Sequence, residues 1–346
     1  LGICKPSLLW LSSFLTGRMQ CVSLNDISSP LTCVNSGVVQ GSVLGPILFT
    51  FYINDLPSAC PNCDLKLFAD DAKCYKRIRI PDDRIILQQS LNELCKWAKK
   101  WCLNLSVDKC FFFQVGYRNL VLAYRLGDEL LSPCDSILDL GITIHSSLKS
   151  GRHCTSIAAR ANARSKLILK SFLSNDPIIL KRAFVVYVRP LLEYCSCVWS
   201  PHLKLDIELI ENVQRTYTRH LFRCCRLPPL SYAERLTYLN LQRLELRRAH
   251  ADLVCMFKLT HGLLSSTLCD VLQLASSVNT SVNTRGHKYK LFTKRCNKNV
   301  FSTFFINRVK KIWNSLPENC FYADNLRSFK NNISSVDLSK FLIGRA

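Results

Sequence analysis

Two adjacent carboxylates, Asp70 and Asp71, are the residues of this sequence that most clearly suggest chemistry. Before them Leu65 and Leu67 alternate with polar or aromatic residues, and a second short run follows directly after. This pattern predicts a β-hairpin whose tight turn carries both acids. Side-by-side carboxylates repel each other and are costly to desolvate, which favours a cation between them and a substrate. The alternative is a solvated turn, because Asp is common in turns.

Mg²⁺ is the cation that best suits this pair, with Mn²⁺ as the alternative. It takes carboxylate oxygens and is commonly shared with substrate phosphates. Two such ions, about 3.5–4 Å apart, hold the attacking and leaving oxygens of a phosphoryl transfer. Asp70 and Asp71 are therefore the candidate metal ligands and catalytic residues.

A longer block upstream gives the pair a family context. Residues 36–49 read SGVVQGSVLGPILF, and residues 52–57 read YINDLP. Together with Phe-Ala-Asp-Asp at 68–71, these segments resemble the reverse transcriptases of non-LTR (LINE-type) retrotransposons in order and separation. One position departs from the family pattern, since Val39 stands where a Pro is usual.

The resemblance implies RNA-templated synthesis of DNA from deoxynucleotides with two Mg²⁺ ions. It implies that Asp70 and Asp71 are metal ligands. It also places four residues beside the incoming nucleotide and the template, namely Gln40, Gly41, Phe68 and Ala69.

Other segments carry weaker parts of the same resemblance. Residues 104–110 correspond to an Asn-Pro-Glu-Lys-Cys segment, which implies that Lys109 donates a proton to the departing pyrophosphate. The alternative is a solvated loop lysine, because a general acid needs a specific geometry. Residues 139–144 read as one strand that resembles a Leu-Gly segment, which places Leu140 and Gly141 near the primer terminus. The resemblance covers nearly the whole chain and is most specific at residues 36–75.

A third carboxylate, which the resembled enzymes need, is missing. It comes from an upstream strand in an Asp-Phe-x-x-Ala-Phe-Asp context that this sequence does not contain. Because the chemistry requires preorganised metal ions, we expect this chain by itself to be inactive as a polymerase. The chain starts at Leu1, and we interpret it as an N-terminally truncated fragment of a longer reading frame. The alternative from a different class is a non-catalytic, basic nucleic-acid-binding remnant.

The charge balance favours a polyanionic partner. Lys and Arg number 46 and Asp and Glu 25, which gives a formal net charge of +21. The expected partners are an RNA template, a DNA primer or target, and deoxynucleotides. A membrane surface is the competing partner, but no apolar run approaches the ~20 residues of a spanning helix. We expect an intracellular protein, in the nucleus or the cytoplasm, and the sequence leaves its oligomeric state open.

Three basic segments are candidates for contact with nucleic acid. Arg160 and Arg164 share one face of a helix expected from residue 150, which suits a thumb helix that follows a duplex backbone. A solvated basic face is the alternative. Arg215 and Arg219 begin a second stripe. Residues 285–311 contain nine basic residues, no acid and interleaved aromatics, which suits single-stranded nucleic acid. Arg285 and Lys288 belong to this segment, whose Phe304 and Phe305 are alternatively core residues.

Nineteen cysteines in a chain that is 48% hydrophobic predict mostly reduced, buried thiols. Cys60 and Cys63 have the spacing of a zinc half-site, but no second pair with that spacing follows. The expected fold is α+β. It comprises a partial right-hand polymerase palm of mixed or antiparallel sheet with helices (1–147), an all-α thumb (148–226) and a basic, helical C-terminal region (227–346). Within the palm, a helix over residues 42–55 is expected to stop at Pro57.

Overall fold

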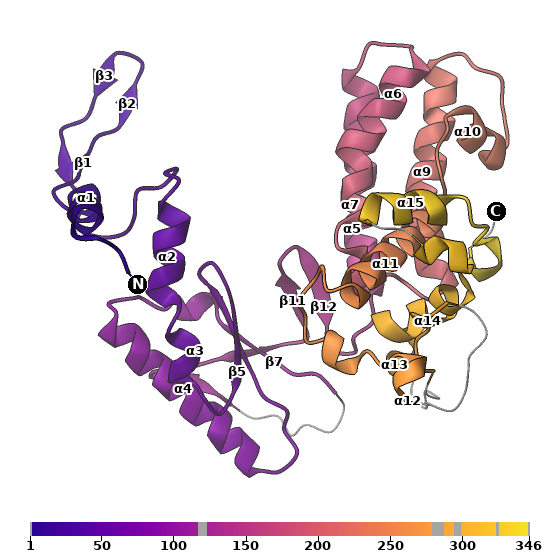
Figure 1. Ribbon diagram of the computed structural model, residues 1–346. Helices are drawn as coiled ribbons and strands as arrows, with labels where there is room; N and C mark the ends of the chain where they lie inside the picture. The colour runs from indigo at the N-terminus through magenta and orange to yellow at the C-terminus, as the bar shows by residue number, and fades with distance from the viewer. Residues whose placement is uncertain (1, 117–122, 279–286, 294–298, 323–324, 345–346) are drawn as a thin grey trace. The chain divides into compact units, whose positions relative to one another are not determined.

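Short antiparallel hairpins and helices alternate in the first part of the chain, and helices dominate the second (Figure 1). The structure is a computed structural model that describes residues 2–116, 123–278, 287–293, 299–322 and 325–344. Contacts divide the chain into two units, one of residues 1–112 and 120–133 and one of residues 113–119 and 134–346. The expectation of a mixed α and β fold is confirmed.

The first unit begins with a helix and two small antiparallel strand pairs. Asn25 takes a left-handed φ of 53°, which a tight turn requires and which Asn tolerates better than most residues. The elements are α1 (Lys5–Leu15), β1 (Met19–Gln20) paired with β4 (Thr32–Cys33), and β2 (Ser23–Leu24) paired with β3 (Ile27–Ser28).

The helix expected over residues 42–55 is two helices, α2 (Gly45–Ile53) and α3 (Leu56–Ala59). The expectation that Pro57 stops a helix is wrong, because Pro57 lies in the first turn of α3, where a missing N–H costs no hydrogen bond. Pro46 occupies the equivalent place in α2. Residues 36–41 form a loop before α2.

A small apolar core holds the central hairpin of this unit. Strand β5 (Asp64–Phe68) pairs with β6 (Asp71–Tyr75). The long helix α4 (Asp82–Lys100) follows them in the chain. Leu65 of β5 is buried in one cluster with Leu94 and Trp97 of α4. Burying three such side chains stabilises the hairpin by several kcal/mol, at about 1.5–3 kcal/mol for each.

The remaining strands fall between residues 111 and 145, the part of the sequence in which the chain passes from the first unit to the second. Strand β7 (Phe111–Phe113) pairs with β10 (Ser132–Cys134), and β8 (Arg125–Leu126) pairs with β9 (Glu129–Leu130). The single strand expected over residues 139–144 is wrong, because β11 (Ser136–Asp139) and β12 (Ile142–His145) form a hairpin there. Leu140 and Gly141 have φ values of 45° and 84°, so both adopt the positive φ that a two-residue hairpin turn favours.

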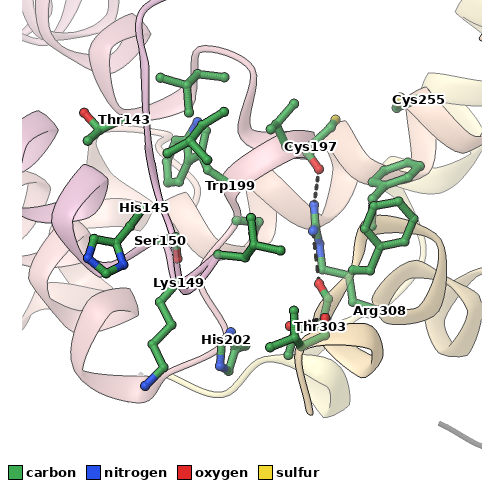
Figure 2. A pocket seen from close by; sticks show the side chains of 18 of the residues that line it. Thr143, His145, Lys149, Ser150, Cys197, Trp199, His202, Cys255, Thr303 and Arg308 are labelled. Atoms are coloured by element: carbon green, nitrogen blue, oxygen red, sulfur yellow. Dashed lines mark hydrogen bonds between the residues drawn. The ribbon is translucent and has the colours of Figure 1, made fainter. Parts of the chain in front are cut away.

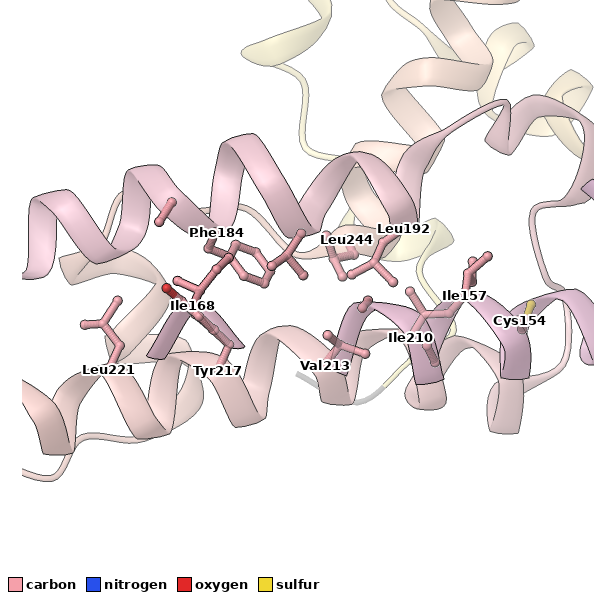
Figure 3. Packing of buried hydrophobic residues seen from close by; sticks show 14 of the residues in the cluster. Cys154, Ile157, Ile168, Phe184, Leu192, Ile210, Val213, Tyr217, Leu221 and Leu244 are labelled. Atoms are coloured by element: carbon pink, nitrogen blue, oxygen red, sulfur yellow. The ribbon is translucent and has the colours of Figure 1, made fainter. Parts of the chain in front are cut away.

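Three long helical segments form the first core of the second unit (Figure 3). Tyr217 and Phe184 pack in this core with their ring centroids 4.7 Å apart, and the Tyr217 hydroxyl donates to the Leu180 carbonyl at 2.7 Å. Asp176 caps α6, since its carboxylate accepts from the Ile178 N–H at 2.7 Å. The elements are α5 (Gly151–Ser171), α6 (Pro177–Ala183), a π-helical segment (Phe184–Val188), α7 (Arg189–Glu193), α8 (Ser196–Trp199) and α9 (Lys204–Cys224).

Helices α10 (Tyr232–Tyr238) and α11 (Leu244–Thr260) are attached to α9 through a buried carboxylate. Glu211 of α9 accepts from the Tyr232 hydroxyl and from the Leu244 N–H at 3.0 Å, which satisfies a backbone donor at the start of α11. Arg248 of α11 is only 2% exposed, and its charge interacts favourably with Glu211. Burial raises the pKa of Glu211, while Tyr232 and Arg248 oppose that rise.

Glu211→Ala is expected to lower the free energy of unfolding by about 3–5 kcal/mol, because it removes the strongest favourable charge interaction of the buried Arg248 and leaves the Leu244 N–H without its acceptor. Urea unfolding followed by circular dichroism measures this change. Glu318→Ala, at an exposed position of the same unit, is the control and is expected to change stability by no more than about 0.5 kcal/mol. Equal losses in the two variants would contradict the structural role of Glu211.

A second core fills the C-terminal half of this unit. Trp313 is fully buried and Phe305 is 6% exposed, so the core alternative holds for Phe305, whereas Phe304 is 43% exposed. The buried His287 ring stacks on Phe321 with centroids 3.8 Å apart. The helices are α12 (Ala275–Val278), α13 (Asn299–Thr303), α14 (Phe305–Ser315) and α15 (Leu326–Ser334). Short 3-10 turns occupy Cys269–Val271, Glu318–Phe321 and Ser339–Phe341, besides Val107–Lys109 in the first unit.

The cysteines are less buried than expected. Eighteen of them lie in the part of the chain that the structure describes, all without a disulfide, and only Cys60, Cys154 and Cys320 are fully buried. Cys60 donates to the Ser90 carbonyl at 3.2 Å. Among the described residues no group of three or more His, Cys, Asp or Glu side chains could hold a metal ion, so Cys60 and Cys63 gain no further ligands there.

Acidification is expected to destabilise the second unit. Burial lowers the pKa of His153, His250, His261 and His287 below the usual value of 6.5. A depressed pKa means that the stability from each neutral ring is fully present above about pH 6.5 and is lost as pH falls through its folded pKa. The raised pKa of Glu211 acts in the opposite direction. Thermal melting between pH 7.5 and 5 should therefore show a steeper decline for the natural chain than for His153→Gln, and identical pH profiles would contradict the account.

Candidate functional site

The hairpin that carries Asp70 and Asp71 is the one predicted from sequence. Phe68 pairs with Asp71 across a two-residue turn formed by Ala69 and Asp70. Asp71 is therefore the first residue of β6, and only Asp70 lies in the turn itself. Ala69 has a φ of 49°, a left-handed conformation that costs a non-glycine residue roughly 1–2 kcal/mol. The turn thus holds both acids at the tip of the hairpin.

The two faces of the hairpin differ in character. Paired strand residues share a face, so Leu65 and Cys74 lie on one side, which packs on the core of the first unit. Asp71 lies on the other side with Phe68, which is 61% exposed, and with the Lys66–Lys73 pair. Basic and aromatic side chains therefore flank Asp71 on the outer face.

The acids suit a divalent cation only in part. Both are exposed, and carboxylate oxygens are the donors that Mg²⁺ prefers. No third His, Cys, Asp or Glu joins them among the residues that the structure describes. The pair could supply two carboxylate ligands, with the remaining positions left to substrate phosphates, water or a further carboxylate.

The other residues expected near the nucleotide lie in two exposed turns. Gln40 and Gly41 form the turn before α2, and Gly41 has a φ of 82° with open space around it. Lys109 ends the 3-10 turn Val107–Lys109 with an exposed side chain. Gly45 was not anticipated, although a Cβ there would approach the Val39 carbonyl oxygen to 2.9 Å. The sequence signal that could have indicated this close approach is a glycine directly before a proline at the start of a helix.

A groove in the second unit brings together residues that the sequence analysis assigned separately. Leu140, Gly141 and Arg160 line a hollow of about 370 Å³ beside Tyr194. Arg160 also lines an adjoining hollow of about 300 Å³ with Arg164. The candidate primer-region turn and the two basic residues of α5 therefore share one surface, called the α5 groove below.

Two contacts fix the turn at the end of this groove. The Tyr194 hydroxyl donates to the Leu140 carbonyl at 3.2 Å, and a Cβ on Gly141 would touch the Tyr194 ring at 3.5 Å. The Thr143 N–H donates to Nδ1 of the buried His153 at 3.1 Å, which ties β12 to α5. Tyr194 is 56% exposed and was missed, because nothing in its local sequence separates it from a surface tyrosine.

The other basic residues expected to contact nucleic acid differ in how far their side chains are already engaged within the protein. Arg215 donates to Glu208 at 3.2 Å and to Asn212 at 2.6 Å, and its guanidinium lies 4.9 Å from the centroid of the Tyr232 ring. Arg219 is exposed on the same helix. Lys288 is exposed beside the Tyr289 ring, at 5.1 Å from its centroid. Arg285 lies outside the described residues.

Comparison with known sequences agrees with the hairpin's chemistry. Residues 2–144 match the family "Reverse transcriptase (RNA-dependent DNA polymerase)". This part of the chain is therefore similar to reverse transcriptases. The matched segment contains the Gln40–Gly41 turn, the Asp70–Asp71 hairpin and Lys109, and it ends within β12.

Several relatives that match this chain come from mobile elements. A probable RNA-directed DNA polymerase from transposon BS of Drosophila melanogaster is 28% identical, over 62% of this chain and 25% of the relative. The RNA-directed DNA polymerase from mobile element jockey of Drosophila funebris is 26% identical, over 62% and 24%. The resemblance to non-LTR retrotransposon enzymes is thereby confirmed. The chain spans about a quarter of the length of these relatives, and no solved structure matches it.

Proposed function

We propose that this chain is the nucleic-acid-handling portion of an RNA-directed DNA polymerase of a non-LTR retrotransposon. The observation that carries the proposal is the hairpin tip, where Asp70 and Asp71 are exposed together inside the segment that matches the reverse transcriptase family. In this role the two carboxylates hold Mg²⁺, or Mn²⁺ in its place, against the phosphates of a deoxynucleotide. Gln40, Gly41 and Phe68 border that nucleotide and the RNA template.

The second unit supplies the grip on the template and primer in this proposal. Phosphates lie along the α5 groove, where Arg160 and Arg164 stand one helical turn apart. The Leu140–Gly141 turn at the end of the groove supports the primer strand. Residues 1–147 then serve as a partial palm, 148–226 as a thumb and 227–346 as a basic helical extension.

The chain by itself is expected to give no template-directed synthesis. Preorganised metal ions are required for the reaction, and the described residues offer no third carboxylate beside the pair. Extension of oligo(dT) on poly(rA) with Mg²⁺ measures the activity. Processive synthesis that disappears in Asp70→Asn would contradict this expectation while supporting the assignment of the site.

A non-catalytic nucleic-acid-binding protein is the second candidate, and the same missing carboxylate favours it. It shares the α5 groove with the first candidate but needs no metal at the hairpin. Deoxynucleotide binding in the presence of Mn²⁺ distinguishes the two candidate functions. Only the polymerase assignment predicts that Asp70→Asn weakens this binding. A membrane surface remains the competing partner. The described helices include none with the length and apolarity to cross a bilayer.

A further inference from the structure

Two cysteines meet at a cavity of the second unit that the proposed function does not use. Cys197 of α8 and Cys255 of α11 both line a cavity of about 410 Å³, with Trp199, Phe304 and Arg308 among its other walls (Figure 2). Both cysteines are half-buried residues of the cavity wall.

The backbone places the two thiols against each other. The Cys197 thiol lies 3.6 Å from the carbonyl oxygen of Ala251, which is one turn before Cys255 in α11. Side chains of a helix lean toward its N-terminus, so the Cys255 side chain leans over the same turn. Helices α8 and α11 pack against each other here, and each thiol shifts the pKa of the other, so the two thiols are neighbours.

Fixed charges surround the pair. Arg308 of α14 donates to the Cys197 carbonyl at 2.6 Å (Figure 2). It also donates to the Asp252 carboxylate at 2.9 Å. The neighbouring Cys197 thiol, together with Lys258 and Arg308, lowers the pKa of the Cys255 thiol to about 7. The neighbouring Cys255 thiol and burial raise the pKa of Cys197. Cys255 is therefore the attacking thiolate of the pair and Cys197 the resolving thiol.

We propose that Cys197 and Cys255 form a redox-active dithiol that small-molecule disulfides of the glutathione type convert into an intramolecular disulfide. The Cys255 thiolate attacks one sulfur of oxidised glutathione, which forms a mixed disulfide and releases one glutathione thiolate. Cys197 then loses its proton to solvent, and its thiolate attacks the Cys255 sulfur and releases the second glutathione. Two protein thiols are oxidised and one glutathione disulfide is reduced to two thiols.

The new bond joins two helices whose contact is otherwise non-covalent. It attaches α8 to α11 beside the point where Arg308 anchors α14 to the Cys197 carbonyl. Oxidation is therefore expected to make the second unit more resistant to thermal unfolding and proteolysis.

Peptide mapping of the full 346-residue chain tests the proposal. The chain is incubated with oxidised glutathione at pH 7.5, quenched with acid, alkylated with N-ethylmaleimide and digested. The expected product is a peptide pair cross-linked between Cys197 and Cys255, formed at lower oxidant concentration than any disulfide of Cys195, Cys224 or Cys225. In Cys197→Ala, Cys255 is expected to retain glutathione as a stable mixed disulfide.

Cys195→Ala is the matched control, because Cys195 is exposed and lies two residues from Cys197. The Cys197–Cys255 cross-link should persist in this variant. With the natural chain at pH 7, N-ethylmaleimide should label Cys255 about tenfold faster than Cys195. The proposal is overturned if oxidant concentrations that modify Cys195 leave Cys197 and Cys255 unlinked, or if Cys255 reacts no faster than Cys195.

Discussion

Asp70→Asn should abolish DNA synthesis in any active polymerase that contains this chain together with a strand bearing a third carboxylate. A neutral amide keeps the shape of the side chain but loses the charge that holds Mg²⁺. Metal stabilisation of the transition state is worth several kcal/mol, so the rate should fall on the order of a thousandfold. Binding of template and primer should stay at the parental level, because the hairpin keeps its register. Primer extension and filter binding measure the two effects.

Asp64→Asn is the matched control for this prediction. Asp64 is the first residue of β5 in the same hairpin, is also exposed and pairs with Tyr75 at the end of the hairpin remote from the turn. Its removal changes the net charge by the same amount without touching the proposed metal ligands, so synthesis should remain near the parental rate. Near-parental synthesis by Asp70→Asn would show that the turn is structural.

Binding of this chain to RNA and DNA should depend steeply on salt and little on base sequence. Each neutralised phosphate contributes roughly −0.7 to −0.9 to the slope of log K against log salt. If about six phosphates are engaged, affinity should fall by about three orders of magnitude between 50 and 200 mM salt. Filter binding at four salt concentrations measures the slope, and co-sedimentation with anionic vesicles tests the membrane alternative.

Replacing Arg160 and Arg164 together by Ala should reduce the magnitude of that slope by roughly 1.4–1.8, because two phosphate contacts are lost. Arg152→Ala with Lys166→Ala is the matched control on the same helix, since both residues are exposed but neither lines the α5 groove. That pair should change the slope less. A flat salt response of the natural chain, or preferential binding to vesicles, would count against nucleic acid as the partner.

Local sequence patterns predicted hairpins and helices of this chain correctly where the hydrophobic periodicity and the turn residues of a segment indicated the same element. Alternation around Asp70 and Asp71 predicted β5 and β6, and the helix expected from residue 150 is α5. The same reasoning failed at Leu140, because an alternating run hid a turn whose first residue is a leucine with positive φ. A bulky residue in that conformation is held by its surroundings, here by the hydrogen bond from Tyr194.

Contacts between distant segments could not be predicted from spacing. The regular interval from Arg215 to Arg219 indicated a basic face but not that Glu208 and Asn212 engage Arg215. The α5 groove combines a turn, a helix and Tyr194, which only the packing of β12, α5 and α7 brings together. The Cys197–Cys255 pair is likewise separated in sequence by α9, α10 and most of α11.

Photo-cross-linking to a template–primer duplex tests most directly whether this chain handles nucleic acid as proposed. An RNA–DNA duplex with photoreactive groups along the backbone and at the primer end is irradiated with the chain at low salt, and cross-linked peptides are identified by mass spectrometry. The account predicts cross-links at the Leu140–Gly141 turn and the Arg160–Arg164 stretch of α5, together with the hairpin tip at residues 68–71. The α5 cross-links should weaken in the Arg160→Ala, Arg164→Ala variant. Cross-links confined to other surfaces, such as the exposed lysines of α4, would contradict it.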